Sequence, residues 1–185
     1  EQALDQLARL IPQTPSLIGE MGLDFRPKYL NDSQSRQIEF FEAQLELAEV
    51  ENRPVVLHLV RAEDEAFRIF QVHGAPKAGG FVHAFNGSIK QAETYLEHGL
   101  LLSVGGAVVR SENKRLHQAV KGIPLDRLLL ETDSPDQPPP DWPNEMNEPS
   151  SLLQVARVVA ELKGVTQDEV LVTSKTNLRR LITRG

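Results

Sequence analysis

Residues 128–135 read LLLETDSP, so an apolar run leads directly into two acidic residues and ends at a proline. A short apolar run bounded by a turn signal is typical of a buried strand. Three other stretches share this arrangement: SLIGE (16–20), PVVLH (54–58) and GGFVH (79–83). Each run therefore ends in a side chain that can bind a metal ion or exchange a proton, namely Glu20, His58, His83 and Asp133.

The order of apolar runs and helical patterns predicts an α/β fold. We expect strands at 16–20, 54–59, 79–85, 100–105 and 126–133, and helices at 34–51, 62–71 and 112–121 and after Ser88, Ser151 and Thr166. Five β-α units in series imply a parallel sheet with helices outside it. A doubly wound sheet and a TIM barrel both remain open, but no strand is followed by a glycine-rich phosphate-binding motif, which weighs against a dinucleotide fold. Without a clear linker, residues 1–185 are predicted to form a single domain.

The composition limits the function classes. There are no cysteines, which excludes disulfides and thiolate metal sites and fits a cytoplasmic protein. No apolar run approaches the length of a membrane span. The net charge is -6, whereas a non-specific nucleic-acid coat protein is normally basic. If the protein acts on nucleic acid, it should do so at a local site where metal ions supply the positive charge.

The four strand-end residues predict a metal centre. In a parallel barrel the C-terminal strand ends share one rim, where active sites form. Two histidines and two carboxylates there suit divalent ions, because a carboxylate can bridge two of them. Each residue alone also has a structural interpretation: His58 or His83 as a core histidine, Glu20 as an arginine partner, and Asp133 as a turn residue. Four such residues in register favour the metal site.

Five stretches together resemble the TatD family of metal-dependent deoxyribonucleases, in that family's order: GEMGLDF (19–25), PVVLH (54–58), VHAFNGS (82–88), LLLETDSP (128–135) and NEP (147–149). The resemblance implies a TIM barrel of the metal-dependent hydrolase type, with about five of its eight β-α units present in this chain. It also implies a phosphodiesterase that cleaves DNA with water activated by two divalent ions, which could be Mg, Mn or Zn.

The resemblance also implies residue roles. Glu20 would bridge two metal ions, His58 and His83 would bind the second ion, and Asp133 would bind the first and take the proton of the attacking water. Strand alternation puts Glu131 on the same face as Asp133, so a role for Glu131 stays open. The candidate substrate-binding residues are Arg61, Asn86, Asn147 and Glu148.

Two features depart from the family. The first strand of the family carries a His-x-His motif that completes the first metal site, and no such motif occurs in this chain. We therefore expect that an N-terminal portion with three strands is missing and that the isolated chain self-associates through exposed sheet edges. The family also has an arginine where this chain has Val60, so Arg61 is a candidate phosphate ligand or simply a solvated arginine at a helix start.

Two alternative functions remain open. The same kind of metal site can hydrolyse another ester or an amide, such as an aminoacyl ester, because the sequence does not define the substrate. The missing His-x-His motif also fits a catalytically silent, truncated remnant.

Overall fold

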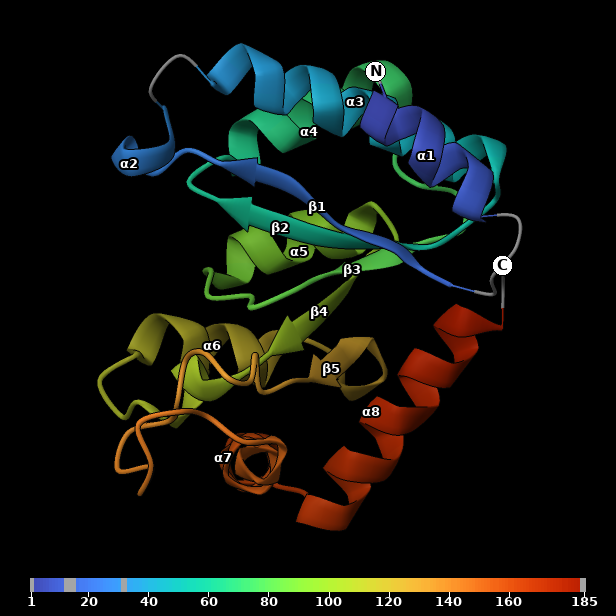
Figure 1. The fold of residues 1–185 in the computed structure, drawn as a ribbon. Coiled ribbons are helices and arrows are strands. Elements are labelled where there is room, and N and C mark those ends of the chain that lie inside the picture. Colours follow the sequence, from blue (N-terminus) through green and yellow to red (C-terminus); the bar gives the residue numbers. More distant parts are fainter. Residues whose placement is uncertain (1, 12–15, 31–32, 184–185) are drawn as a thin grey trace. The chain divides into compact units, whose positions relative to one another are not determined.

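The computed structural model describes residues 2–11, 16–30 and 33–183 (Figure 1). The strands are β1 (Ile18–Asp24), β2 (Val55–Val60), β3 (Gly80–Val82), β4 (Leu101–Val104) and β5 (Leu128–Leu130). The helices are α1 (Gln2–Leu10), α2 (Pro27–Leu30), α3 (Gln34–Val50), α4 (Glu63–His73), α5 (Ile89–Glu97), α6 (Lys114–Gly122), α7 (Leu152–Lys163) and α8 (Gln167–Ile182). The strand order is β1-β2-β3-β4-β5.

Two compact units make up the chain, one running to Val82 and rejoined by the chain from Leu181, the other spanning His83–Arg180. In the first unit, β1 pairs in parallel with β2, and β2 pairs in parallel with β3. Helix α3 packs on β1 and α4 packs on β2, so both helices cover one face of these strands (Figure 1). The core of this unit is apolar on that side, with Leu23, Phe41, Leu57 and Ile69 fully buried.

A bulge interrupts the pairing of β1 with β2. Ile18 lies opposite Val55 and Met21 lies opposite Leu57, so β1 carries one more residue than β2 over this interval. Such a bulge redirects a side chain and is frequent beside active sites. Here Ile18 and Met21 are buried, whereas the two residues between them, Gly19 and Glu20, are exposed.

Glycine at positions 19 and 22 allows β1 to approach β2 closely. A Cβ at Gly22 would lie 1.8 Å from the carbonyl oxygen of His58, and a Cβ at Gly19 would lie 2.7 Å from Cβ of Val56. Both distances are far below van der Waals contact, so any larger residue would push the strands apart. The two glycines of the GEMGLD stretch therefore fix the backbone of His58 beside β1.

The second unit is built around the parallel pair β4 and β5, in which Leu102 lies opposite Leu128. Helix α5 packs on β4, α7 packs on β5, and α6 lies against both helices. The N-terminus of α5 carries a capping box, in which the Ser88 hydroxyl accepts from the Gln91 amide and the Gln91 side chain accepts from the Ser88 amide. This confirms the predicted start of that helix.

The structure confirms five parallel strands alternating with helices, as expected for part of a TIM-barrel type fold. Three strands are shorter than predicted, and the smallest difference is in β4, which spans Leu101–Val104 instead of 100–105. β3 ends at Val82 rather than at 85, because Ala84 adopts a positive φ of 48°. β5 ends at Leu130 rather than at 133, and Asp133 itself has a positive φ of 59°. The candidate ligands His83 and Asp133 thus lie in the loops that follow β3 and β5. That the chain is one domain stays a prediction.

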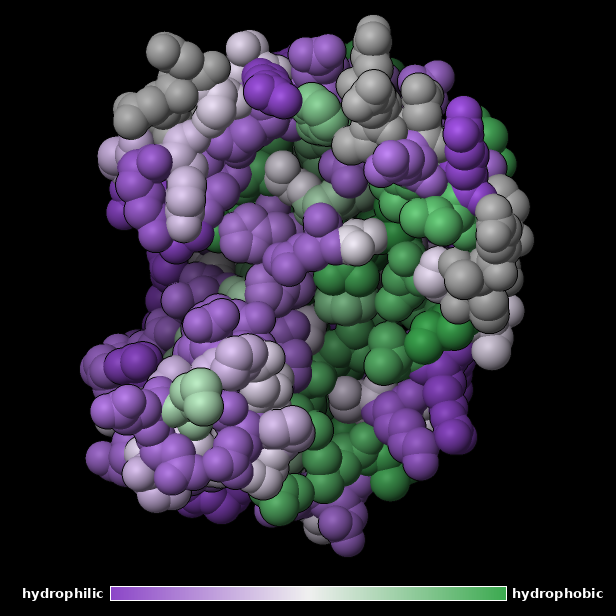
Figure 2. Space-filling view, in the orientation of Figure 1, coloured by the Kyte–Doolittle hydropathy of each residue, from purple (hydrophilic) through white to green (hydrophobic). Residues whose placement is uncertain are grey.

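Several large apolar side chains are exposed, and Figure 2 shows apolar residues in green beside polar ones on the face in view. Among the helices in the described ranges, none combines the length and apolar character needed to cross a membrane.

Candidate metal centre

Strands β1 and β2 bring Glu20 and His58 together in the first unit. Nδ1 of His58 lies 3.0 Å from Oε1 of Glu20, and the two side chains are 31% and 47% exposed. The sequence placed Glu20 at the end of its strand, but the structure places it inside β1 (Ile18–Asp24), at the bulge. The bulge rather than a strand end therefore directs Glu20 to His58.

The other nitrogen of His58 faces a second carboxylate. Nε2 of His58 lies 3.5 Å from Oδ2 of Asp24, whose side chain is only 15% exposed. Arg26 holds that carboxylate, with Nε 2.8 Å from Oδ1 and 2.9 Å from Oδ2. The hydrogen bond from the Arg26 guanidinium is the main reason that the pKa of Asp24 falls from its usual 3.8 to about 2, against the opposing effect of burial.

Gln37 on α3 fixes the backbone of Asp24. Its Oε1 accepts a hydrogen bond from the Asp24 amide at 2.8 Å, and its Nε2 donates to the Asp24 carbonyl at 3.2 Å. Together with His58, Glu20, Met21 and Gly22, these two residues line an open pocket of about 350 Å³. The pocket gives the His58 edge access to solvent and to a ligand.

His83 is the first residue of the second unit, and its ring lies beside the carboxylate of Glu131. It directly follows Val82, which lies opposite Leu57 in the β2-β3 pairing, so chain continuity brings its backbone next to that of His58. Nδ1 of His83 lies 3.4 Å from Oε1 of Glu131, and these side chains are 13% and 17% exposed. The same oxygen accepts a hydrogen bond from the Ala84 amide at 2.6 Å.

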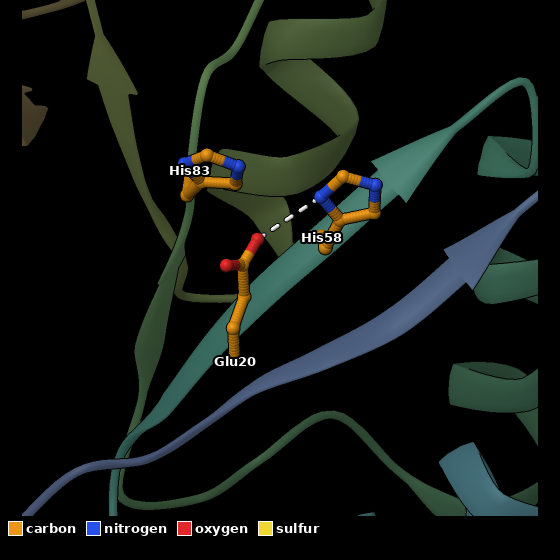
Figure 3. A group of neighbouring side chains, drawn as sticks. All are labelled: Glu20, His58 and His83. Carbon is orange, nitrogen blue, oxygen red and sulfur yellow. Dashed lines mark hydrogen bonds and ion pairs between the residues drawn. The ribbon is translucent and has the colours of Figure 1, made fainter. Parts of the chain in front are cut away.

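Glu20, His58 and His83 form a group that could hold a metal ion. Each offers one ligand atom, and these atoms all lie within 4.8 Å of one another (Figure 3). A histidine that ligates a metal typically gives its other ring N–H to a carboxylate, which fixes its tautomer. Asp24 is placed to do this for His58 and Glu131 for His83. The donor set of two imidazoles and one carboxylate fits a divalent transition metal or Zn²⁺.

Asp133 does not belong to this group among the residues that the structure describes. It lies three residues beyond β5 and is half-buried. Its Oδ2 accepts a hydrogen bond from the side-chain amide of Gln137, and its backbone carbonyl accepts one from the backbone amide of Asp136 at 2.8 Å. The expected role of Asp133 at a first metal ion stays a prediction.

The four candidate substrate-binding residues differ in their surroundings. Arg61 is exposed directly after β2 and has a positive φ of 56°. Asn86 is exposed and accepts hydrogen bonds from the side chains of Asn113 at 2.8 Å and Arg115 at 2.7 Å. Glu148 is exposed and accepts from Asn144 at 2.6 Å. Asn147, by contrast, is 3% exposed. Substrate contact stays a prediction for all four.

Sequence reasoning missed Asp24 and Gln37 and left Glu131 open. The signal for Asp24 was present, because residues 20, 22 and 24 alternate on one face of β1, so Asp24 shares that face with Glu20. Gln37 carried no such signal, because it lies on α3, 13 residues after Asp24, and strand alternation does not relate a helix residue to a strand residue.

Comparison with known proteins gives one consistent result. The family model described as "TatD related DNase" matches residues 1–183. An uncharacterized metal-dependent hydrolase, YabD of Bacillus subtilis, is 37% identical over 164 residues, which cover 89% of this chain and 64% of that protein. A protein of Erwinia amylovora named 3'-5' ssDNA/RNA exonuclease TatD is 34% identical over 169 residues, with 89% and 64% covered.

A solved structure agrees with the fold. The crystal structure of YjjV, a TatD homologue from Escherichia coli, matches with a TM-score of 0.88 and 31% identity, covering 96% of this chain and 69% of that one. This chain thus spans about two thirds of the length of the proteins that it matches.

Proposed function

The chain belongs to the TatD-related DNase family, a family with metal-dependent hydrolases among its members, and from this we propose that it is the site-bearing part of a metal-dependent phosphodiesterase that cleaves DNA. The relative named as an exonuclease supports nucleic acid as the substrate, and the ligand set supports hydrolysis.

The observation that carries this proposal is the arrangement of the two histidines. His58 presents Nδ1 to Glu20 and Nε2 to Asp24, while His83 presents Nδ1 to Glu131. A core histidine needs one acceptor and one donor for its two ring nitrogens, and neither has to be a carboxylate that converges with a second histidine. Here each histidine lies beside its own carboxylate, and one nitrogen of each ring lies near Glu20. In metal centres, a histidine that binds the ion commonly has such a carboxylate at its other ring nitrogen.

Chemistry at this site would divide between the ion and the chain. A bound divalent ion supplies Lewis acidity, which makes a water molecule nucleophilic and offsets negative charge on a phosphoryl group. Glu20, His58 and His83 would hold the ion. Asp133 would take a proton from the attacking water as its oxygen bonds to phosphorus, and would return that proton to the leaving ester oxygen as the P–O bond breaks.

A hydrolysis assay with matched histidine variants tests this function. Purified protein is incubated with end-labelled single-stranded DNA and, separately, with an aminoacyl ester, after chelation and after addition of Mg²⁺, Mn²⁺ or Zn²⁺. We expect DNA cleavage that needs the metal and falls by at least about 100-fold in His58→Ala and His83→Ala. The control is His73→Ala, because His73 is also a histidine of the first unit near a carboxylate, with Nε2 3.4 Å from Glu42.

Each outcome is decisive. Metal-dependent cleavage of the ester but not of DNA would replace the phosphodiesterase by an acyl hydrolase. Metal binding in calorimetry without hydrolysis of either substrate would favour the catalytically silent chain. Equal loss of activity in His58→Ala and His73→Ala would show that the effect is not specific to the metal centre.

A further inference from the structure

We infer that Asn147 is a positioning residue for Asp133: its buried amide holds the loop 132–137 in the shape that presents the Asp133 carboxylate. This inference rests on the proposed function for the role of Asp133, whereas the loop geometry stands on its own contacts. It also assigns Asn147 a place behind the site rather than in contact with substrate.

The Asn147 amide is fully engaged by the loop around Asp133. Its two N–H groups reach three backbone carbonyls, those of Thr132, Asp136 at 2.8 Å and Gln137 at 3.3 Å. These carbonyls lie on both sides of Asp133 along the chain. One buried side chain therefore holds together the two arms of the turn.

Further bonds of Asn147 fix its own position. Its side-chain oxygen accepts from the Glu148 amide at 2.9 Å, and its backbone amide donates to the Pro135 carbonyl at 2.9 Å. With only 3% of the residue exposed, the amide has no access to a substrate. A buried polar group that loses its partners is costly, so this set of bonds forms or breaks together.

The loop needs such a clamp because its conformation is otherwise unfavourable. Both Asp133 and Gln137 lie in the left-handed region, with φ of 59° and 50°, and glutamine, unlike glycine, asparagine or aspartate, seldom occupies it. Gln137, whose carbonyl Asn147 holds, also donates from its side chain to Oδ2 of Asp133. Release of Asn147 would therefore free both the backbone and the carboxylate of Asp133.

The second unit offers a matched control in Asn177. It is likewise 3% exposed, and its Nδ2 donates to two backbone carbonyls, those of Leu125 at 3.0 Å and Leu128 at 2.8 Å. These lie at the start of β5, away from the Asp133 loop. Asn147→Ala and Asn177→Ala should thus cost similar stability, while only the first should act on Asp133.

The test measures hydrogen exchange and hydrolysis in the same variants. In Asn147→Ala, exchange of the Asp136 amide, which is bonded to the Asp133 carbonyl, should accelerate by about 10-fold or more relative to Asn177→Ala at equal distance from the unfolding midpoint. The kcat for DNA should fall about 10- to 100-fold with KM changed less than about twofold. Asn147→Asp keeps the acceptor for Glu148 but loses the donors, so it should not restore either readout.

Equal exchange of the Asp136 amide in Asn147→Ala and Asn177→Ala would overturn the inference, as would full recovery in Asn147→Asp or a change confined to KM. If the wild-type protein does not cleave DNA, the proposed function fails, but the exchange comparison still decides whether Asn147 holds the loop.

Discussion

Gly22→Ala should both destabilise the first unit and displace the backbone of His58. The new Cβ would lie 1.8 Å from the carbonyl oxygen of His58, 2.7 Å from its carbonyl carbon and 2.9 Å from its amide nitrogen. All three atoms belong to the backbone of β2, so no side-chain rotation can relieve the overlap. The strands must separate by more than 1 Å to reach ordinary contact, roughly 3.4 Å.

The expected cost follows from that geometry. Overpacking of a well-packed region typically costs about 1–3 kcal/mol, and a backbone clash stands at the upper end, so we expect a loss of about 3 kcal/mol in the free energy of unfolding. Gly164→Ala is the control, because Gly164 has a φ of 68° and no atom within 4 Å of an added Cβ. Its cost is backbone strain alone, about 1 kcal/mol.

Urea denaturation followed by circular dichroism measures both variants, and calorimetry with Mn²⁺ measures binding at the His58 side. We expect Gly22→Ala to lose about 2 kcal/mol more than Gly164→Ala and to bind the ion more weakly, while Gly164→Ala binds as the wild type does. Equal destabilisation by the two substitutions, or unchanged metal affinity in Gly22→Ala, would refute the reasoning that the close approach of β1 and β2 holds His58 in place.

Three further predictions concern the metal centre and its supporting charges. Calorimetric titration of this chain with Mn²⁺ or Zn²⁺ should reveal about one strong binding site, formed by Glu20, His58 and His83. Two equally tight sites would contradict this prediction, as would unchanged metal binding in the His58→Ala, His83→Ala double variant. Asp24→Asn should weaken that binding about 10- to 100-fold in calorimetry, since Nε2 of His58 loses its carboxylate; an unchanged affinity would show that Asp24 serves only Arg26. Because the pKa of Asp24 is lowered from 3.8 to about 2, its charged form should stabilise the fold above about pH 4, and this stability should be lost as the pH falls through about 2. The urea midpoint of the wild type should therefore decline more between pH 5 and pH 2 than that of Asp24→Asn. Parallel declines would contradict the assignment.

The strands and the approach of two candidate ligands, His58 and His83, followed from local pattern. Apolar runs of five or six residues define parallel strands, and a histidine at the end of two neighbouring runs predicts that the two rings meet. His58 and His83 do so because Leu57 lies opposite Val82, the residues just before them. This inference needs only the chain direction of two adjacent strands.

Features that depend on the fit of distant backbones were not predictable in the same way. The extra residue in β1 lies where Gly19 and Gly22 approach β2 closely, which no periodicity encodes, so the sequence placed Glu20 at a strand end instead of at a bulge. Likewise, the NEP stretch did not show that Asn147 is buried against the loop 132–137. Loop closure rather than residue type decides such burial.

The separate carboxylates behind the histidines make two chemically identical side chains inequivalent. With Nε2 of His58 facing Asp24 and Nδ1 of His83 facing Glu131, the rings would approach an ion by opposite edges, Nδ1 from His58 and Nε2 from His83. Methylation of a single ring nitrogen separates these edges. Nδ1-methylhistidine would block coordination at position 58 but only the carboxylate contact at position 83, and Nε2-methylhistidine would do the reverse. The ring edge that each histidine would offer to an ion is therefore set by the carboxylate beside its other nitrogen.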